Sequence, residues 1–413
     1  MRTIKCVVVC LFFGFSAAPA VFAQSYNSYN GNNSYNFNEE GFRIGDYEFN
    51  NVIGKQLGPV TVKATAESEM EYDSNIFWTP TDKKADTINV TSPAVLVDMP
   101  FGLDQRHLAQ LMYNADIGTF AKYSSQDYIN QYAAFNSDFK LPFGYLDVQD
   151  KFEHTSDRAD TEFDSEVVRN NNDASAALGV KFNKLALETG YSDYVHTYEN
   201  NLYTQYGYTE DMVSEIAYYQ LFPKTKALVE YDHGWINYYK DAARDGSYDQ
   251  ERIGLKGDIT GKTQAIIKLG YQDRSYDNNT GFEGFVAEVG TITQLTERTK
   301  LSLTYDQGAQ ESTYLNNNYY DMHYFYMTLE QKLISRWSLE FNSGIERNIY
   351  PEVDPTLFQK RMDSILVDGL ALKYNVKEWL SVKIGYTFRE DLSTIRSQSY
   401  NDNLWTVGFK LQY

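Results

Sequence analysis

The sequence VTVKATAESEMEY, residues 60–72, alternates between two kinds of side chain. Even-numbered positions, beginning with Val60 and Val62, are apolar or small, whereas odd-numbered positions, beginning with Thr61 and Lys63, are polar. Successive side chains of a β-strand point to opposite faces of a sheet. This period of two therefore predicts a strand with one apolar face and one strongly polar face.

The same alternation recurs to the end of the chain. It is clear in residues 264–274, 337–346 and 380–389. About 18 such segments fit between residues 59 and 413, roughly one per 20 residues, which is the spacing of an outer-membrane barrel strand plus its connection. The sequence predicts an all-β fold, a transmembrane antiparallel up-and-down β-barrel of about 18 strands.

The connections between these segments alternate in length, which distinguishes a barrel from a soluble sandwich. Short ones fall near residues 142–144 and 183–184, and long polar ones near 155–170 and 197–211. Tight turns at one end and longer loops at the other are typical of bacterial transmembrane barrels, whose termini lie in the periplasm. A solenoid is disfavoured because the loops vary in length and no consensus repeat occurs. We expect no loop to be long enough to act as an infolded constriction.

Composition excludes other classes of protein. The chain has 413 residues, 15% of them aromatic, and a formal net charge of -19. So many aromatic residues argue against a disordered chain, and the acidic balance argues against a nucleic-acid partner. The mean hydropathy of -0.51 fits a barrel, because only one face of each strand meets outer-membrane lipid.

The N-terminus has the features of a secretory signal peptide. Arg2 and Lys5 precede a short apolar run, and small residues at positions 21 and 23 predict cleavage after Ala23. A retained membrane helix is disfavoured, since the apolar run is too short. Both cysteines lie within residues 1–23, so the mature chain has no disulfide. Residues 24–58 follow as a low-complexity Ser/Tyr/Asn-rich periplasmic tail, and the barrel occupies residues 59–413.

The chain ends on a strand that resembles the terminal assembly signal of outer-membrane proteins. Every second residue is apolar or aromatic, and the last one is aromatic. We expect the barrel-insertion machinery to read this face, and Tyr and Trp at strand ends to form interfacial girdles. The signal residues are Trp405, Val407, Phe409, Leu411 and Tyr413.

Three short motifs carry a family resemblance. They are YDSNIF at residues 72–77, LFPKT at 221–225 and SYNDN at 399–403. On these the chain resembles outer-membrane β-barrel porin-like proteins associated with bacterial exopolysaccharide biosynthesis and export. The resemblance implies a passive, non-enzymatic channel in the outer membrane that moves an exopolysaccharide, together with periplasmic polysaccharide-export proteins. The alternatives are a general or small-solute nutrient porin, or a structural or adhesive barrel.

The polar face of each strand supplies the candidate functional residues. A Lys or Arg facing lipid at mid-depth costs ~2–4 kcal/mol, and Asp or Glu somewhat less, so these side chains are expected to face the lumen. They could do no more than solvate a water-filled interior, but an acidic excess would favour cations, and Tyr beside Asn could hold sugars. The predicted lumen residues are Lys63, Glu67, Glu69, Glu71, Asn130, Tyr132, Asn136, Asp138, Glu188, Tyr194, Glu230, Asp232, Arg252, Lys256, Lys268, Glu340 and Glu346.

We find no sequence pattern for catalysis, a metal or a cofactor. The five histidines are not paired at metal-ligand spacing, and the chain has no Gly-x-Ser-x-Gly. Residues 241–246 hint at a calcium loop, but Ala243 stands where an oxygen ligand is needed. We therefore expect a solvated turn there.

Overall fold

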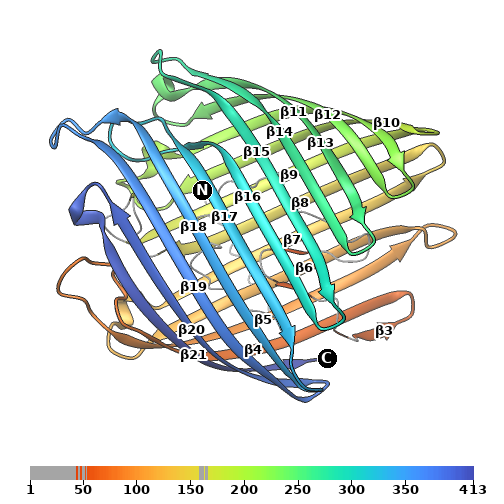
Figure 1. Cartoon of the computed structure of the whole chain (residues 1–413), viewed down its shortest axis with the longest axis horizontal. Helices are drawn as coiled ribbons and strands as arrows, with labels where there is room; N and C mark the ends of the chain where they lie inside the picture. Colours follow the sequence, from red (N-terminus) through yellow and green to blue (C-terminus); the bar gives the residue numbers. More distant parts are fainter. Residues whose placement is uncertain (1–42, 45–46, 49–51, 53, 158–161, 163–165) are drawn as a thin grey trace, which may run out of the picture.

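A closed β-barrel forms the body of the protein (Figure 1). The computed structural model describes residues 43–44, 47–48, 52, 54–157, 162 and 166–413. The predicted signal peptide and most of the predicted tail lie outside these residues. Within them, strands β4 to β21 form one ring of 18 antiparallel neighbours, which confirms the predicted fold.

Each strand of the ring is longer than the ~9–11 residues that a tilted strand needs to cross a membrane. The strands are β4 (Val60–Asp73), β5 (Asp86–Phe101), β6 (His107–Phe120), β7 (Tyr128–Leu141), β8 (Gly144–Asp157), β9 (Val167–Phe182), β10 (Leu185–Tyr198), β11 (Tyr208–Phe222), β12 (Thr225–Tyr238), β13 (Gly246–Thr260), β14 (Thr263–Tyr276), β15 (Gly281–Thr296), β16 (Thr299–Glu311), β17 (Tyr319–Lys332), β18 (Trp337–Val353), β19 (Lys360–Lys377), β20 (Leu380–Ser393) and β21 (Tyr400–Gln412).

Pairing between β21 and β4 closes the ring. The last residue seals the seam, since the backbone N–H of Tyr413 donates to Ala64 O at 2.7 Å and Ala64 N–H donates to Tyr413 O at 2.9 Å. A short strand β3 (Lys55–Leu57) forms a hairpin with the start of β4, and β1 (Arg43–Ile44) pairs with β2 (Tyr47–Glu48) apart from the barrel. Barrel closure leaves no free edge among the 18 strands.

The two rims differ, as the connection lengths predict. One rim, the short-turn end, carries tight turns such as residues 183–184, where Asn183 has φ 51°, a value that Asn tolerates. The other rim, the long-loop end, carries longer connections, among them the 3₁₀ turns η1 (Ser124–Gln126), η2 (Thr204–Tyr206), η3 (Ala242–Arg244) and η4 (Arg396–Gln398). Residues 241–246, which hint at a calcium loop in the sequence, include η3. They form an ordinary turn, in which Asp245 Oδ1 accepts a hydrogen bond from Tyr238 N–H at 2.6 Å.

The two faces of each strand follow the alternation in the sequence. On β4, Met70 is 59% exposed on the outer face and Glu69 is 6% exposed on the inner face. The five residues of the predicted assembly signal lie on the outer face of β21 and at its end. At the short-turn end, Phe182, Phe222, Trp337 and Trp379 are exposed, which is the placement expected of an aromatic girdle.

Candidate functional site in the barrel lumen

The structure places the 17 predicted lumen residues on the inner face of their strands. On β12, for example, buried Glu230 and Asp232 alternate with exposed Val229 and Tyr231. They do not form one site, because they are spread around the ring and along its height. The predicted residues are Lys63, Glu67, Glu69 and Glu71 on β4, Asn130, Tyr132, Asn136 and Asp138 on β7, Glu188 and Tyr194 on β10, Glu230 and Asp232 on β12, Arg252 and Lys256 on β13, Lys268 on β14, and Glu340 and Glu346 on β18.

An ion-pair network brings five inner-face residues together at mid-height. Arg252 lies 3.1 Å from Glu230, 2.9 Å from Asp232 and 3.0 Å from Glu288. Lys268 lies 3.1 Å from Glu230 and 3.5 Å from Glu288. Adjacent strands β12 to β15 supply all five side chains. The two basic residues offset most of the acidic charge here, which reduces the field that the acidic composition alone suggests.

Charges on the opposite wall are paired in the same way. Lys63 lies 2.9 Å from Asp98, and Lys383 lies 3.6 Å from Glu69. The charged lumen is therefore a mosaic of neighbouring acids and bases. Acidic residues still outnumber basic ones, but they are spread around the ring rather than gathered at one place.

Towards the long-loop end, the wall changes to arginine and tyrosine. Arg274 donates to Glu311 at 2.6 Å and lies 4.7 Å from the centre of the Tyr248 ring. Arg361, only 1% exposed, pairs with Asp363 at 2.8 Å. Its guanidinium lies 4.3 Å from the Tyr314 ring and 4.9 Å from the Tyr350 ring. A guanidinium both pairs with a carboxylate and stacks on a ring, which explains arginine at these positions.

Arg244 ties three long loops together. It lies in η3, is buried, and donates to the carbonyl oxygens of Asn318 at 3.1 Å, Asn317 at 3.4 Å and also Ser312. The Tyr206 ring of the β10–β11 loop lies 5.3 Å away. Burial alone would lower the pKa of Arg244, but the nearby Tyr238 and Glu311 raise it above its usual value. The side chain thus stays charged and holds the loops at one side of the mouth.

A second loop contact crosses the mouth. Glu162, in the β8–β9 connection, accepts hydrogen bonds from Ser312 Oγ at 2.7 Å, Thr313 N at 2.8 Å and Thr313 Oγ1 at 2.9 Å. Strands β9 and β16 lie far apart around the ring, so this contact bridges distant parts of the rim. No single infolded loop is expected from the connection lengths, and none is needed for this contact, because two loops of the long-loop end meet each other.

Beneath these loops lies a cavity with an empty volume of about 780 Å³, open solvent included. Side chains from β9–β12 enclose one side, and side chains from β16–β20 enclose the other. Its lining comprises Glu162, Arg169, His196, Tyr198, Tyr206, Tyr208, Tyr238, Gln310, Glu311, Ser312, Thr313, Tyr320, Glu346, Asn348, Ile365 and Arg389. Of the predicted residues only Glu346 lines it.

Sequence reasoning missed most of this cavity because its members come from many strands. A usable signal was present: Tyr198, Tyr208, Tyr238 and Tyr248 all occupy the inner face at the strand ends next to long loops. Tyrosine at strand ends is predicted to lie at the lipid interface, whereas the register places these four inside. Buried His196 contacts Asn171 Oδ1 at 2.6 Å and so has an ordinary polar partner.

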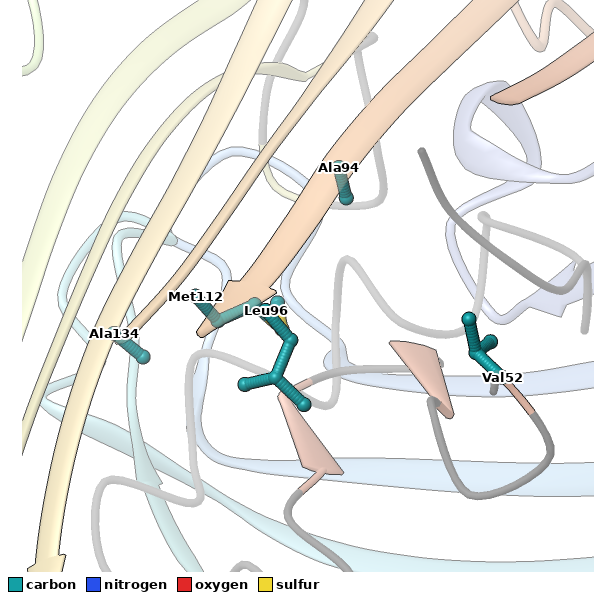
Figure 2. Close-up of a cluster of buried hydrophobic side chains, with 5 residues drawn as sticks. All are labelled: Val52, Ala94, Leu96, Met112 and Ala134. Carbon is teal, nitrogen blue, oxygen red and sulfur yellow. The ribbon is translucent and has the colours of Figure 1, made fainter. Parts of the chain in front are cut away.

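At the short-turn half, one residue of the N-terminal segment lies against the lumen wall. Val52, only 5% exposed, packs with Ala94, Leu96, Met112 and Ala134 (Figure 2). These four are inner-face residues of β5, β6 and β7. The sequence offered a hint, because residues 94–97 are apolar on both faces of β5.

The described residues contain no group of three or more His, Cys, Asp or Glu arranged to hold a metal ion. They also contain no helix that is long and apolar enough to cross a membrane.

The closed 18-stranded ring, its lipid-compatible outer face and its polar lumen define an outer-membrane β-barrel porin. Residues 50–413 match the family described as "Putative beta-barrel porin 2", and the chain belongs to that family. This confirms the porin-like part of the resemblance seen in the sequence. No curated protein matches the chain.

Several solved barrels are similar to this chain. Acinetobacter baumannii OccAB3 is 11% identical, with a TM-score of 0.49 over 86% of this chain and 100% of that one. OccAB4 from the same organism is 11% identical, with a TM-score of 0.47 over 87% and 99%. Pseudomonas aeruginosa OpdQ is 10% identical, with a TM-score of 0.46 over 85% and 99%. Identities this low carry no information about cargo.

Proposed function

We propose that this porin passes small hydrophilic solutes across the outer membrane by passive diffusion. One observation carries the proposal: the lumen contains a cavity of about 780 Å³, open solvent included, enclosed by polar side chains of opposite walls. A small polar solute meets hydrogen-bonding partners on both walls of this cavity as it moves.

The loops above the cavity support a size limit. Arg244 and Glu162 hold loop residues 312–318 across the mouth from two directions. A small solute needs only the space between these contacts, whereas a polymer needs them to separate. Pairing likewise holds the charged side chains below the cavity in fixed positions.

Exopolysaccharide export is the second candidate, and the inner face of β7 favours it. Asn130, Tyr132, Asn136 and Asp138 form a polar and aromatic stripe there, interrupted by Ala134. Tyr rings and amide groups on one stripe suit a sliding sugar chain. In this case periplasmic polysaccharide-export proteins would supply direction, and the contacts of Glu162 would have to open during transport.

Liposome swelling with reconstituted protein separates the two candidates. A small-solute porin gives rates that fall steeply from monosaccharide to tetrasaccharide, while an export conduit admits dextran chains. The variant Glu162→Ala removes the bridge to Thr313 and should raise the size limit. Exposed Asp82, in the β4–β5 loop, supplies a matched control as Asp82→Ala. Passage of dextran by the unmodified protein would reject the small-solute proposal.

A further inference from the structure

We propose that the cavity beneath the mouth is a binding site for a small, uncharged, polyhydroxylated solute. The inference rests on the proposed porin function and names its substrate class. Three observations carry it. The cavity lining has unused hydrogen-bonding atoms, its charged groups already have partners, and it contains tyrosine rings.

Two buried amide groups of the lining have unused hydrogen-bonding atoms. Gln310 is 7% exposed and Asn348 is 2% exposed. Within the described part of the chain, Gln310 Nε2 and Asn348 Oδ1 have no hydrogen-bond partner. Buried polar atoms without partners are uncommon and costly. One of these atoms donates and the other accepts, and a hydroxyl group can satisfy either.

The charged groups of the cavity already have partners. Glu311 accepts from Arg274 at 2.6 Å and from Tyr276 OH at 2.6 Å. Arg389 donates to the Tyr400 hydroxyl at 2.6 Å, and its guanidinium lies 4.6 Å from the Trp78 ring. A charged solute would lose its hydration and would have to compete with these partners. The unused atoms are neutral amides, so the site favours an uncharged ligand.

Tyrosine rings supply the remaining surface. The rings of Tyr208 and Tyr238 lie 5.3 Å apart at 37°, and Tyr198 and Tyr320 line the same cavity. A tyrosine offers an apolar face and a polar tip. A sugar is built in the same way, with C–H groups on its faces and hydroxyls at its edges.

The test uses full-length mature protein in planar bilayers, with glucose and maltose as probes. We expect either sugar to interrupt the ion current in a saturable way, with gluconate and glucosamine weaker. The double variant Gln310→Met and Asn348→Leu should bind maltose roughly tenfold more weakly, because each lost hydrogen bond costs ~0.5–1.5 kcal/mol. Its open-channel current should change little.

Asn342→Leu is the matched control. Asn342 is a buried inner-face residue of the same strand β18, its Oδ1 also lacks a partner among the described residues, and it lies outside the cavity lining. It should leave maltose binding unchanged. Equal loss in the control and the double variant would overturn the proposed site, as would tighter binding of gluconate or glucosamine than of glucose.

Calorimetric titration of maltose into detergent-solubilised protein keeps the two proposals separate. A conducting channel that shows neither current block nor heat of binding rejects the sugar site and leaves the porin function intact. Binding heat that depends on Gln310 and Asn348 without any conductance supports the site and rejects the channel.

Discussion

The two ends of the lumen are built from the same alternating strands but have different chemistry. Near the long loops, buried arginines such as Arg274 and Arg361 stack on tyrosines and pair with carboxylates. Towards the short turns of β5–β7, the inner face carries apolar Leu96 and Met112, covered by Val52. The difference teaches that the inner face of a porin strand is not uniformly a water-solvating face. Side chains at one end hold the loops in place, while Val52 covers part of the inner face at the other.

The largest expected effect concerns the short-turn end, where the barrel is sealed. Deleting Tyr413, or changing Phe409 and Tyr413 to Ser, removes part of the outer apolar face of β21, and the deletion also removes two backbone hydrogen bonds to Ala64. We expect most of the protein to disappear from the outer-membrane fraction, as measured by immunoblot. Tyr239→Ser, at an exposed tyrosine of the long-loop end, is the control. Normal levels of the Tyr413 deletion would mean that the last strand carries no assembly signal.

The next effect concerns the arginines of the long-loop end. Arg361→Met leaves buried Asp363 with the Ser393 hydroxyl but without its counter-charge, and breaking a buried pair typically costs ~3–5 kcal/mol. We expect a clear drop in the unfolding midpoint in detergent. Lys140→Met removes an exposed pairing with Asp138 at the other end and should have little effect. Comparable losses in both variants would contradict the distinction between the two ends.

Val52 tests whether the N-terminal segment narrows the short-turn half. In Val52→Asp a carboxylate replaces an apolar side chain against Leu96 and Met112, and a buried polar group without a partner costs ~1–3 kcal/mol. We expect the segment to leave the wall and single-channel conductance to rise. Leu57→Asp, at an exposed position of β3, should leave conductance unchanged. No rise in Val52→Asp would show that the segment does not limit the current.

Ion selectivity tests the arrangement of neighbouring acidic and basic residues on the lumen wall between the two ends. Changing Glu67, Glu69 and Glu71 to Gln should reduce a modest cation preference, most visibly near 0.01 M salt, where the Debye length is about 30 Å. Reversal potentials measure the effect, and Glu283→Gln on the outer face is the control. Anion preference in the unmodified channel would reject the acidic-lumen prediction and favour an acidic cargo.

The smallest effect concerns the loops and pH. Asp354 accepts from Tyr314 OH at 2.5 Å and from Thr356 N–H at 2.7 Å, and these contacts hold its pKa below the usual value. A lowered folded pKa stabilises the loop above the unfolded value of about 3.9, and the contribution is lost as pH falls through the folded value. The protection of the amides in residues 354–359, measured by hydrogen exchange relative to the intrinsic rate at each pH, should be constant from about pH 7 to 5 and fall below about pH 4. Asp354→Asn should abolish the acid-dependent change.

The family, the strand count and the face of each strand could be predicted from the sequence. A strand has a side-chain period of two, and lipid selects the apolar face, so Val60–Tyr72 alone specifies which residues point inwards. The candidate site could not be predicted in the same way. The alternation predicts that Glu346 and Tyr208 each lie on an inner face. Neither strand's sequence predicts that the two residues line the same cavity.

Only closure of the ring brings such residues to one cavity, because it places strands that are distant in sequence on opposite sides of one space. Glu162 meets Thr313, and Arg244 meets Asn318, through the curvature of the barrel rather than through any local pattern. The sequence by itself determined a barrel with a polar lumen, since local periodicity records contact with lipid. The tertiary structure decided which polar groups remain unpaired at the mouth, since hydrogen bonding across the lumen depends on register and closure.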